Sequence, residues 1–183
     1  DQRYILERIL EIIEDEKPDA VLISGDVYDK PMPSADAVSL LDDFISSLSE
    51  TGAEVFIISG NHDSAERLSF GSQIMDKQGI HFAGRYDGST SRFTLSDEFG
   101  EVDFYMLPFI KPIHVRQAFC EDEKAAEITD FTDAVRFAIS RMNPPSTATG
   151  SRVFLITGIA CLRNRAASAA AATRPSCIMT FQS

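Results

Sequence analysis

The chain has 183 residues, which is enough for one domain with a substantial hydrophobic core. Hydrophobic residues make up 44% and charged residues 25%, and no apolar run reaches the roughly 18 residues that a membrane helix needs. The net charge of −11 argues against a protein that binds DNA over its whole surface, because affinity for phosphate normally comes from lysine and arginine.

The cysteines and the first residues predict a compartment. The chain has an odd number of cysteines, and their spacing suits neither a close pair nor a metal site: Cys120, Cys161 and Cys177. No basic segment followed by an apolar stretch opens the chain, so we expect no export signal. These features predict reduced thiols in a cytoplasmic protein that is not attached to a membrane.

The first half of the chain alternates helices with short, wholly apolar strands, the pattern of a parallel sheet covered by helices on both faces. The expected elements are a helix over 4–13, a strand over 20–24, a helix capped by Ser34 and ending near Gly52, a strand over 55–59, a helix from about 65 to 77 stopped by Gly79, and a strand over 80–83. The second of these helices carries one apolar stripe, formed by Val38, Leu41, Phe44, Ile45 and Leu48.

After residue 83 the pattern changes. Two alternating runs around a polar loop predict an antiparallel hairpin, over 92–95 and 102–107. A helix is expected over 125–142 and a further buried strand over 153–156. The main apolar positions of that helical stretch are Ile128, Phe131, Val135, Phe137 and Ile139.

The two ends of the sequence differ from the rest. The chain begins within a helical pattern and without a methionine, so we expect the domain to start before Asp1. Residues 158–183 contain no Asp or Glu and are rich in alanine, although the preceding chain is acidic. We interpret 1–157 as one incomplete domain and 158–183 as a frameshifted or foreign tail. A genuine alanine-rich helix is the alternative for the tail.

Polar side chains follow two of the predicted parallel strands. Asp26 comes after the first strand, and Asn61, His62 and Asp63 come after the second. Because ligands of open α/β sheets bind at the carboxyl ends of the strands, we expect these residues to lie together. An aspartate can bridge two divalent cations, an asparagine carbonyl is a suitable ligand for a hard cation, and a histidine can protonate a leaving alkoxide.

Each cluster also has a purely structural interpretation. Gly25-Asp26 alone could form a turn, and Asp63 could cap the helix that follows or orient His62. Two equivalent strand ends with ligand-type residues, one βα unit apart, favour a two-metal site. His81 and His114 have no such setting, and we expect both to be structural.

The motifs Gly25-Asp26-Val27-Tyr28-Asp29 and Gly60-Asn61-His62-Asp63 resemble those of calcineurin-like metallophosphoesterases. Within that superfamily the chain is most similar to SbcD-type exonucleases, the nuclease subunits of bacterial SbcCD complexes. The segment from Tyr105 through Leu107-Pro108-Phe109 to Pro112 carries this closer likeness.

The resemblance implies an α/β calcineurin-like metallophosphoesterase sandwich, with two mixed β-sheets flanked by helices. It implies that Asp26 bridges two divalent ions, that Asn61 binds one of them, and that His62 is the phosphate-facing acid. Mn²⁺ is the expected metal and Mg²⁺ is the alternative. Asp29 and Asp63 would have supporting roles. The implied activity is exo- and endonucleolytic cleavage of DNA ends and hairpins. The implied partners are DNA and an SbcC-type ATPase, with a homodimer inside a heterotetramer.

The sequence also departs from the family pattern. A first strand ending in Asp-x-His is not present, Thr157-Gly158-Ile159 stands where a later strand has a histidine, and a Gly-His-x-His pair is missing. We therefore expect this chain to be weakly active or inactive. The alternatives are another phosphodiesterase or phosphatase of the superfamily, which the acidic charge favours, and a degenerate, non-catalytic binding module.

Overall fold

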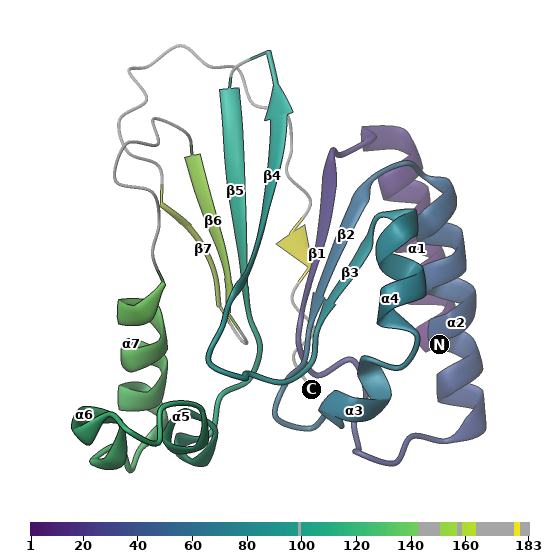
Figure 1. The fold of residues 1–183 in the computed structure, drawn as a ribbon. Helices are drawn as coiled ribbons and strands as arrows, with labels where there is room; N and C mark the ends of the chain where they lie inside the picture. The colour runs from purple at the N-terminus through teal and green to yellow at the C-terminus, as the bar shows by residue number, and fades with distance from the viewer. Residues whose placement is uncertain (99, 143–150, 157–158, 164–177, 180–183) are drawn as a thin grey trace.

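A computed structural model describes residues 1–98, 100–142, 151–156, 159–163 and 178–179 of the chain. Two four-stranded sheets pack face to face, with strand orders β3-β2-β1-β8 and β4-β5-β6-β7 (Figure 1). This is the expected two-sheet α/β sandwich. Among the helices of the described ranges, none combines the length and apolar character needed to cross a membrane.

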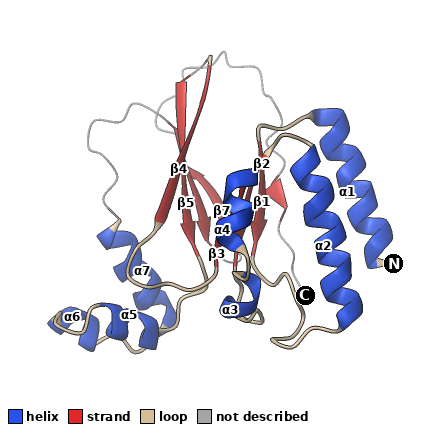
Figure 2. Ribbon diagram, turned by 45° about the vertical axis from the view of Figure 1, so that its right-hand side comes forward, coloured by secondary structure: helices blue, strands red, loops and turns tan. Residues whose placement is uncertain are grey.

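The first sheet is parallel throughout its described strands. It contains β1 (Ala20–Ser24), β2 (Glu54–Ile58), β3 (Ile80–Ala83) and the short β8 (Ile178–Met179). Two long helices, α1 (Gln2–Glu16) and α2 (Ala35–Glu50), cover its outer face, as Figure 2 shows. Their positions confirm the helix–strand order that was expected from apolar periodicity. The expectation of helices on both faces of this sheet was wrong, because its other face packs against the second sheet.

Both faces of β1 and β2 are buried, which explains their wholly apolar sequences. Val21 and Val55 point toward the helices, and Leu22 and Phe56 point toward the second sheet. Between the sheets, the Phe56 ring stacks on Phe104 of β5 with centroids 4.9 Å apart. This inter-sheet core fixes the positions of the β1 and β2 ends, where the candidate site lies.

The second sheet combines antiparallel and parallel pairs. The hairpin β4 (Ser91–Asp97) and β5 (Gly100–Leu107) is antiparallel, as expected. β6 (Ser151–Ile156) then pairs in parallel with β5, and β7 (Ile159–Arg163) is antiparallel to β6.

The helix expected from 65 to 77 is broken. The structure has α3 (Ala65–Leu68), α4 (Ser72–Met75) and a 3₁₀ turn, η1 (Asp76–Gln78). Gly71 lies between α3 and α4 with a φ of 77°, a left-handed conformation that ends one helical segment before the next begins. The expected stop at Gly79, with a φ of 76°, is confirmed.

Three helices lie at one end of the second sheet. A helix missing from the sequence expectation, α5 (Pro112–Ala118), follows β5. The single helix expected over 125–142 is two, α6 (Glu123–Ala126) and α7 (Phe131–Arg141), because the Asp130 side chain caps α7 by accepting the Asp133 amide at 2.9 Å.

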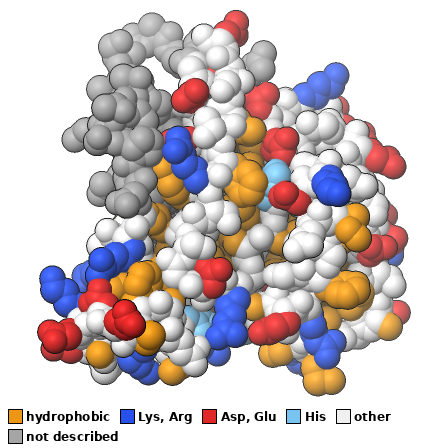
Figure 3. All heavy atoms as spheres, in the orientation of Figure 1, with side chains coloured by type: hydrophobic (Ala, Val, Ile, Leu, Met, Phe, Trp, Pro, Cys, Tyr) orange, Lys and Arg blue, Asp and Glu red, His pale blue; other side chains and the backbone are white. Residues whose placement is uncertain are grey.

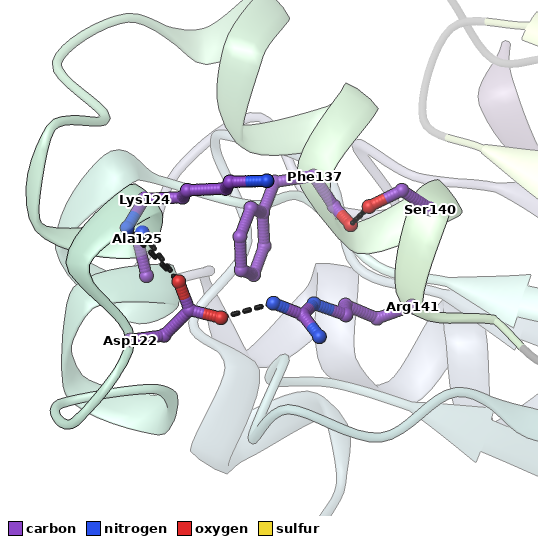
Figure 4. A network of polar contacts seen from close by, with 6 residues as sticks. All are labelled: Asp122, Lys124, Ala125, Phe137, Ser140 and Arg141. Carbon is purple, nitrogen blue, oxygen red and sulfur yellow. Dashed lines mark hydrogen bonds and ion pairs between the residues drawn. The ribbon is translucent and has the colours of Figure 1, made fainter.

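Figure 4 shows how α6 and α7 are joined. The Asp122 carboxylate accepts the Lys124 amide at the start of α6 and forms an ion pair with Arg141 at the end of α7. The Arg141 guanidinium also lies 4.8 Å from the centre of the Phe137 ring. These contacts hold the helical segment that supports α5.

Some apolar positions are less buried than their spacing predicts. On α2, Phe44, Ile45 and Leu48 are buried, whereas Val38 is 45% exposed. In α7 the buried residues are Ala134 and Ala138, and the larger Phe131 and Ile139 face solvent.

Of the alanine-rich tail, only the backbones of β7 and β8 fall inside the described residues. They pair with β6 and β1 respectively. The alanine run 166–172 lies outside the described residues. The interpretation of 158–183 as frameshifted or foreign stays a prediction.

The inter-sheet core predicts a large difference between two Phe→Ala substitutions. Phe56 is 1% exposed and Phe70 is 84% exposed. Phe56→Ala should lower the free energy of unfolding by about 3–5 kcal/mol, because it leaves a cavity, and Phe70→Ala by less than about 0.5 kcal/mol. Urea denaturation measures both, and equal losses would contradict the assignment of Phe56 to the core.

Candidate metal and phosphate site

The loop after β1 turns sharply at Gly25 and Asp26. Both residues have left-handed backbone conformations, with φ values of 82° and 48°. This conformation is ordinary for glycine and costs free energy for an aspartate, so surrounding contacts must maintain it. The contact that the structure shows is a hydrogen bond from the His62 amide to Asp26 Oδ1, at 3.1 Å.

Gly60 makes the close approach of the two strand-end loops possible. A Cβ atom at this position would lie 2.0 Å from Asp26 Oδ1 and 2.2 Å from the Asp26 backbone nitrogen. Any larger residue would therefore displace Asp26. The glycine places the Asp26 carboxylate against the loop that carries Asn61 and His62.

Asp63 connects the same two loops through their backbone. Its carboxylate accepts hydrogen bonds from the amides of Val27 at 3.1 Å, Tyr28 at 2.9 Å and Gly60 at 2.8 Å. The sequence expectation for Asp63 was a helix cap or a partner for His62. The cap of α3 is instead Ser64, whose hydroxyl accepts the Arg67 amide.

A third segment is tied to the end of β2 through Ser59. The Ser59 amide donates to the Ala83 carbonyl of β3, and the Ser59 carbonyl accepts the Phe109 amide, each at 3.0 Å. The Leu107-Pro108-Phe109 segment therefore lies directly beside the Asn61 loop. The residue after β2, the last residue of β3 and the segment after β5 are therefore joined by hydrogen bonds.

The expected site residues differ in their surroundings. Asn61 is exposed, and Asp26 and His62 are half-buried. The His62 Nδ1 atom is buried and has no hydrogen-bond partner within the described part of the chain. Asp29 is exposed and forms an ion pair with Lys30 at 3.8 Å.

His81 and His114 have different settings. His81 is buried, contacts Asp76 at 2.5 Å and Glu54 at 2.7 Å, and stacks on Phe56, which agrees with the structural role that was expected. The Nδ1 atom of His114 accepts a hydrogen bond from the Lys111 amide, and the His114 side chain lines a pocket that Asn61 also lines. Sequence patterns did not indicate that His114 lines this pocket, because α5 itself was not expected.

The oxygen donors of this site fit only part of a metal centre. The Asp26 carboxylate and the Asn61 side-chain oxygen are ligands of the type that hard divalent cations prefer. Within the described ranges, no group of three or more His, Cys, Asp or Glu side chains is placed to hold a metal ion. The described residues therefore supply a partial ligand set.

The two-sheet α/β fold agrees with that of a metallophosphoesterase. Residues 1–144 match calcineurin-like phosphoesterases, and the chain belongs to this family, which uses divalent metals. The chain is 37% identical over 128 residues to the D subunit of nuclease SbcCD from Staphylococcus saprophyticus, covering 69% of this chain and 32% of that protein. It is 31% identical over 159 residues to the D subunit of nuclease SbcCD from Staphylococcus epidermidis, covering 86% of this chain and 40% of that protein.

These relatives agree with the SbcD-type resemblance that the motifs indicated. The chain spans well under half of the length of either relative, 32% and 40% respectively. Their names describe a nuclease and one of its subunits.

The close approach at Gly60 predicts a local effect on the site. Gly60→Ala should lower the free energy of unfolding by about 2 kcal/mol and change the amide chemical shifts of Val27, Tyr28 and His62, because the new Cβ displaces Asp26. The control is Gly52→Ala, where φ is 79° but no atom lies within 4 Å. It should cost about 1 kcal/mol through backbone strain and leave those three amides unchanged. Unchanged amides in Gly60→Ala would contradict the contact.

Proposed function

We propose that this chain is the metal-binding part of an SbcD-type nuclease that hydrolyses phosphodiester bonds in DNA. The observation that carries the proposal is the pair of loops after β1 and β2, which Asp63 joins through three amide hydrogen bonds. This joint brings Asp26 next to the loop of Asn61 and His62. The names of the relatives describe a nuclease, which favours a nucleic-acid substrate over other phosphoesters, and the SbcD-type resemblance makes DNA our choice.

Each of the three residues has a role in the proposal. Asp26 would be the charged ligand and Asn61 the neutral ligand of the divalent ions, with Mn²⁺ the preferred metal and Mg²⁺ the alternative. When bound, such ions polarise the phosphoryl group and activate water. His62, whose buried Nδ1 has no partner within the described ranges, donates a proton to the leaving alkoxide. Asp63 keeps the loops in place, and Asp29 is peripheral.

The same proposal includes partners. An SbcC-type ATPase would supply much of the DNA affinity, which explains how a chain with a net charge of −11 could act on DNA. We further propose that two copies of the nuclease subunit assemble with two ATPase subunits. The processing of DNA ends and hairpins in DNA repair and recombination would be the task of that complex.

Two observations favour other functions. The acidic net charge favours a phosphodiesterase or phosphatase that acts on a small molecule or a phosphoprotein. The partial ligand set among the described residues favours a non-catalytic binding module. The retention of Asp26, Asn61 and His62 together favours an enzyme over such a module, since a binding surface has no need of all three.

An assay with two substrates tests these alternatives. The chain, supplied with Mn²⁺, is incubated with duplex DNA that has a recessed end and separately with bis-p-nitrophenyl phosphate. We expect weak hydrolysis at most, because the ligand set is partial, and we expect any hydrolysis to favour DNA. Robust turnover would contradict the partial site, and a preference for the small substrate would contradict the nuclease.

Variants then test the roles of the residues. His62→Ala should abolish the residual hydrolysis while Mn²⁺ binding, measured by the electron paramagnetic resonance of the free ion, stays within about twofold of the unmodified chain. Asp26→Asn should weaken Mn²⁺ binding at least about tenfold, because it removes the charged ligand. Asp36→Asn, a charge-matched change on the exposed face of α2, is the control and should alter neither. Mn²⁺ binding that is unaffected by Asp26→Asn would refute the metal assignment.

A further inference from the structure

A pocket of about 360 Å³ opens beside the end of β2, next to the candidate metal and phosphate site. Its walls come from the Asn61 loop, the start of α3, the residues after β3, and the segment that leads into α5. Figure 3 shows positive side chains and a histidine gathered at this end of the molecule, between α3 and α5. The lining residues that matter here are Asn61, Glu66, Arg85, Phe109, Lys111 and His114.

The charges in this pocket are unlike those of the molecule as a whole. Arg85 and Lys111 line it from two separate segments, although Asp and Glu outnumber Lys and Arg by 28 to 17 in the chain. Of the two acidic residues in the lining, Asp63 turns its carboxylate toward the backbone amides of the loops. Glu66 is the remaining acid. The pocket therefore combines two cationic side chains with one carboxylate, that of Glu66, which forms no hydrogen bond with the loop amides in the described residues.

One hydrogen bond holds the Arg85 side chain, and another holds the backbone of Lys111. Arg85 Nη2 donates to the Gln117 Oε1 atom at 3.1 Å, and Lys111 donates its amide to His114 Nδ1 at 3.3 Å. The pKa of His114 is below its ordinary value, first because the ring is partly buried and then because Arg85 and Lys111 are close. Glu66, the remaining acid of the lining, acts on this pKa in the opposite direction.

We propose that the Arg85–Lys111 pocket binds the phosphodiester group next to the one that is hydrolysed, on a single strand of DNA. This inference rests on the proposed nuclease function and names a part of its substrate-binding surface. Arg85 and Lys111 contact the phosphate oxygens, and the attached base lies against the apolar side of the pocket, which Phe109 and Ile113 form. These residues position the strand and take no part in bond cleavage.

The size and the chemistry of the pocket favour this ligand. A volume of about 360 Å³ lies in the range of small-ligand sites and suits one nucleotide. An arginine offers paired donors to phosphate oxygens, a lysine adds a point charge, and an aromatic ring next to cations is typical of sites for single-stranded nucleic acids. Because Asn61 lines the same pocket, a strand held here continues directly to the candidate metal and phosphate site.

Binding without metal isolates this contribution. A fluorescein-labelled oligothymidylate is titrated with the full chain in EDTA at low salt, and its anisotropy is measured at several salt concentrations. We expect Arg85→Gln and Lys111→Gln each to weaken binding about threefold to tenfold and to reduce the salt dependence by about 0.7 per lost phosphate contact. Arg67→Gln is the matched control, because Arg67 is exposed on nearby α3 but lies outside the pocket lining. It should stay within about twofold of the unmodified chain.

A second measurement reports on the pocket itself. In the free protein, Arg85→Gln and Lys111→Gln should raise the pKa of His114, measured by NMR, because each removes a positive charge that lowers it. Addition of the oligothymidylate to the unmodified chain should also raise this pKa, since the bound phosphate adds negative charge. A His114 pKa that does not respond to saturating oligothymidylate would overturn the proposal.

Separate outcomes distinguish the pocket from the function on which it rests. If the chain binds oligothymidylate but Arg85→Gln and Lys111→Gln behave like Arg67→Gln, the pocket assignment is wrong and the nuclease proposal stands. Thymidine monophosphate and inorganic phosphate serve as competing probes. If the chain binds either of these and not the oligothymidylate, both the pocket proposal and the DNA nuclease proposal are contradicted.

Discussion

The Asp63 carboxylate is the constraint on which the site depends. It accepts hydrogen bonds from three backbone amides in the two loops that follow β1 and β2. Hydrogen bonds to a charged acceptor are stronger than those between neutral groups. Together with the bond from the His62 amide to Asp26, the Asp63 carboxylate holds the loops at the distance that Gly60 allows. The packed core between the sheets fixes the strands from which these loops extend, because those strands are buried on both faces. Ligand-type side chains are thereby placed before any ligand binds.

Much of this arrangement could be predicted from local sequence patterns. The apolar runs at β1 and β2 have no polar position that could face water, so their burial on both faces followed directly. The rule that parallel strands present their carboxyl ends at one edge then predicted that Asp26 would lie near Asn61 and His62. The hairpin of β4 and β5 was likewise evident from its alternation of apolar and polar residues.

The features that were missed depend on contacts between distant residues. The role of Asp63 could not be predicted, because two of its three partners, Val27 and Tyr28, lie 36 and 35 positions away in the sequence. The glycine at position 71 was a local indication of a helix break, but the helical spacing of the apolar residues around it favoured one continuous helix. The start of α5 also had a local indication, since Pro112 is suited to a first helical turn. Without α5, His114 could not be placed beside Asn61.

The most direct test is the position of bound manganese. Crystals of the chain soaked in Mn²⁺ and measured at the manganese absorption edge would show each bound ion as an anomalous difference peak. We expect a peak in contact with both the Asp26 carboxylate and the Asn61 side-chain oxygen, with the hydrogen bonds of Asp63 to Val27, Tyr28 and Gly60 unchanged. Manganese bound only at other carboxylates, with Asp26 and Asn61 free of it, would contradict the claim that these loops form a metal and phosphate site.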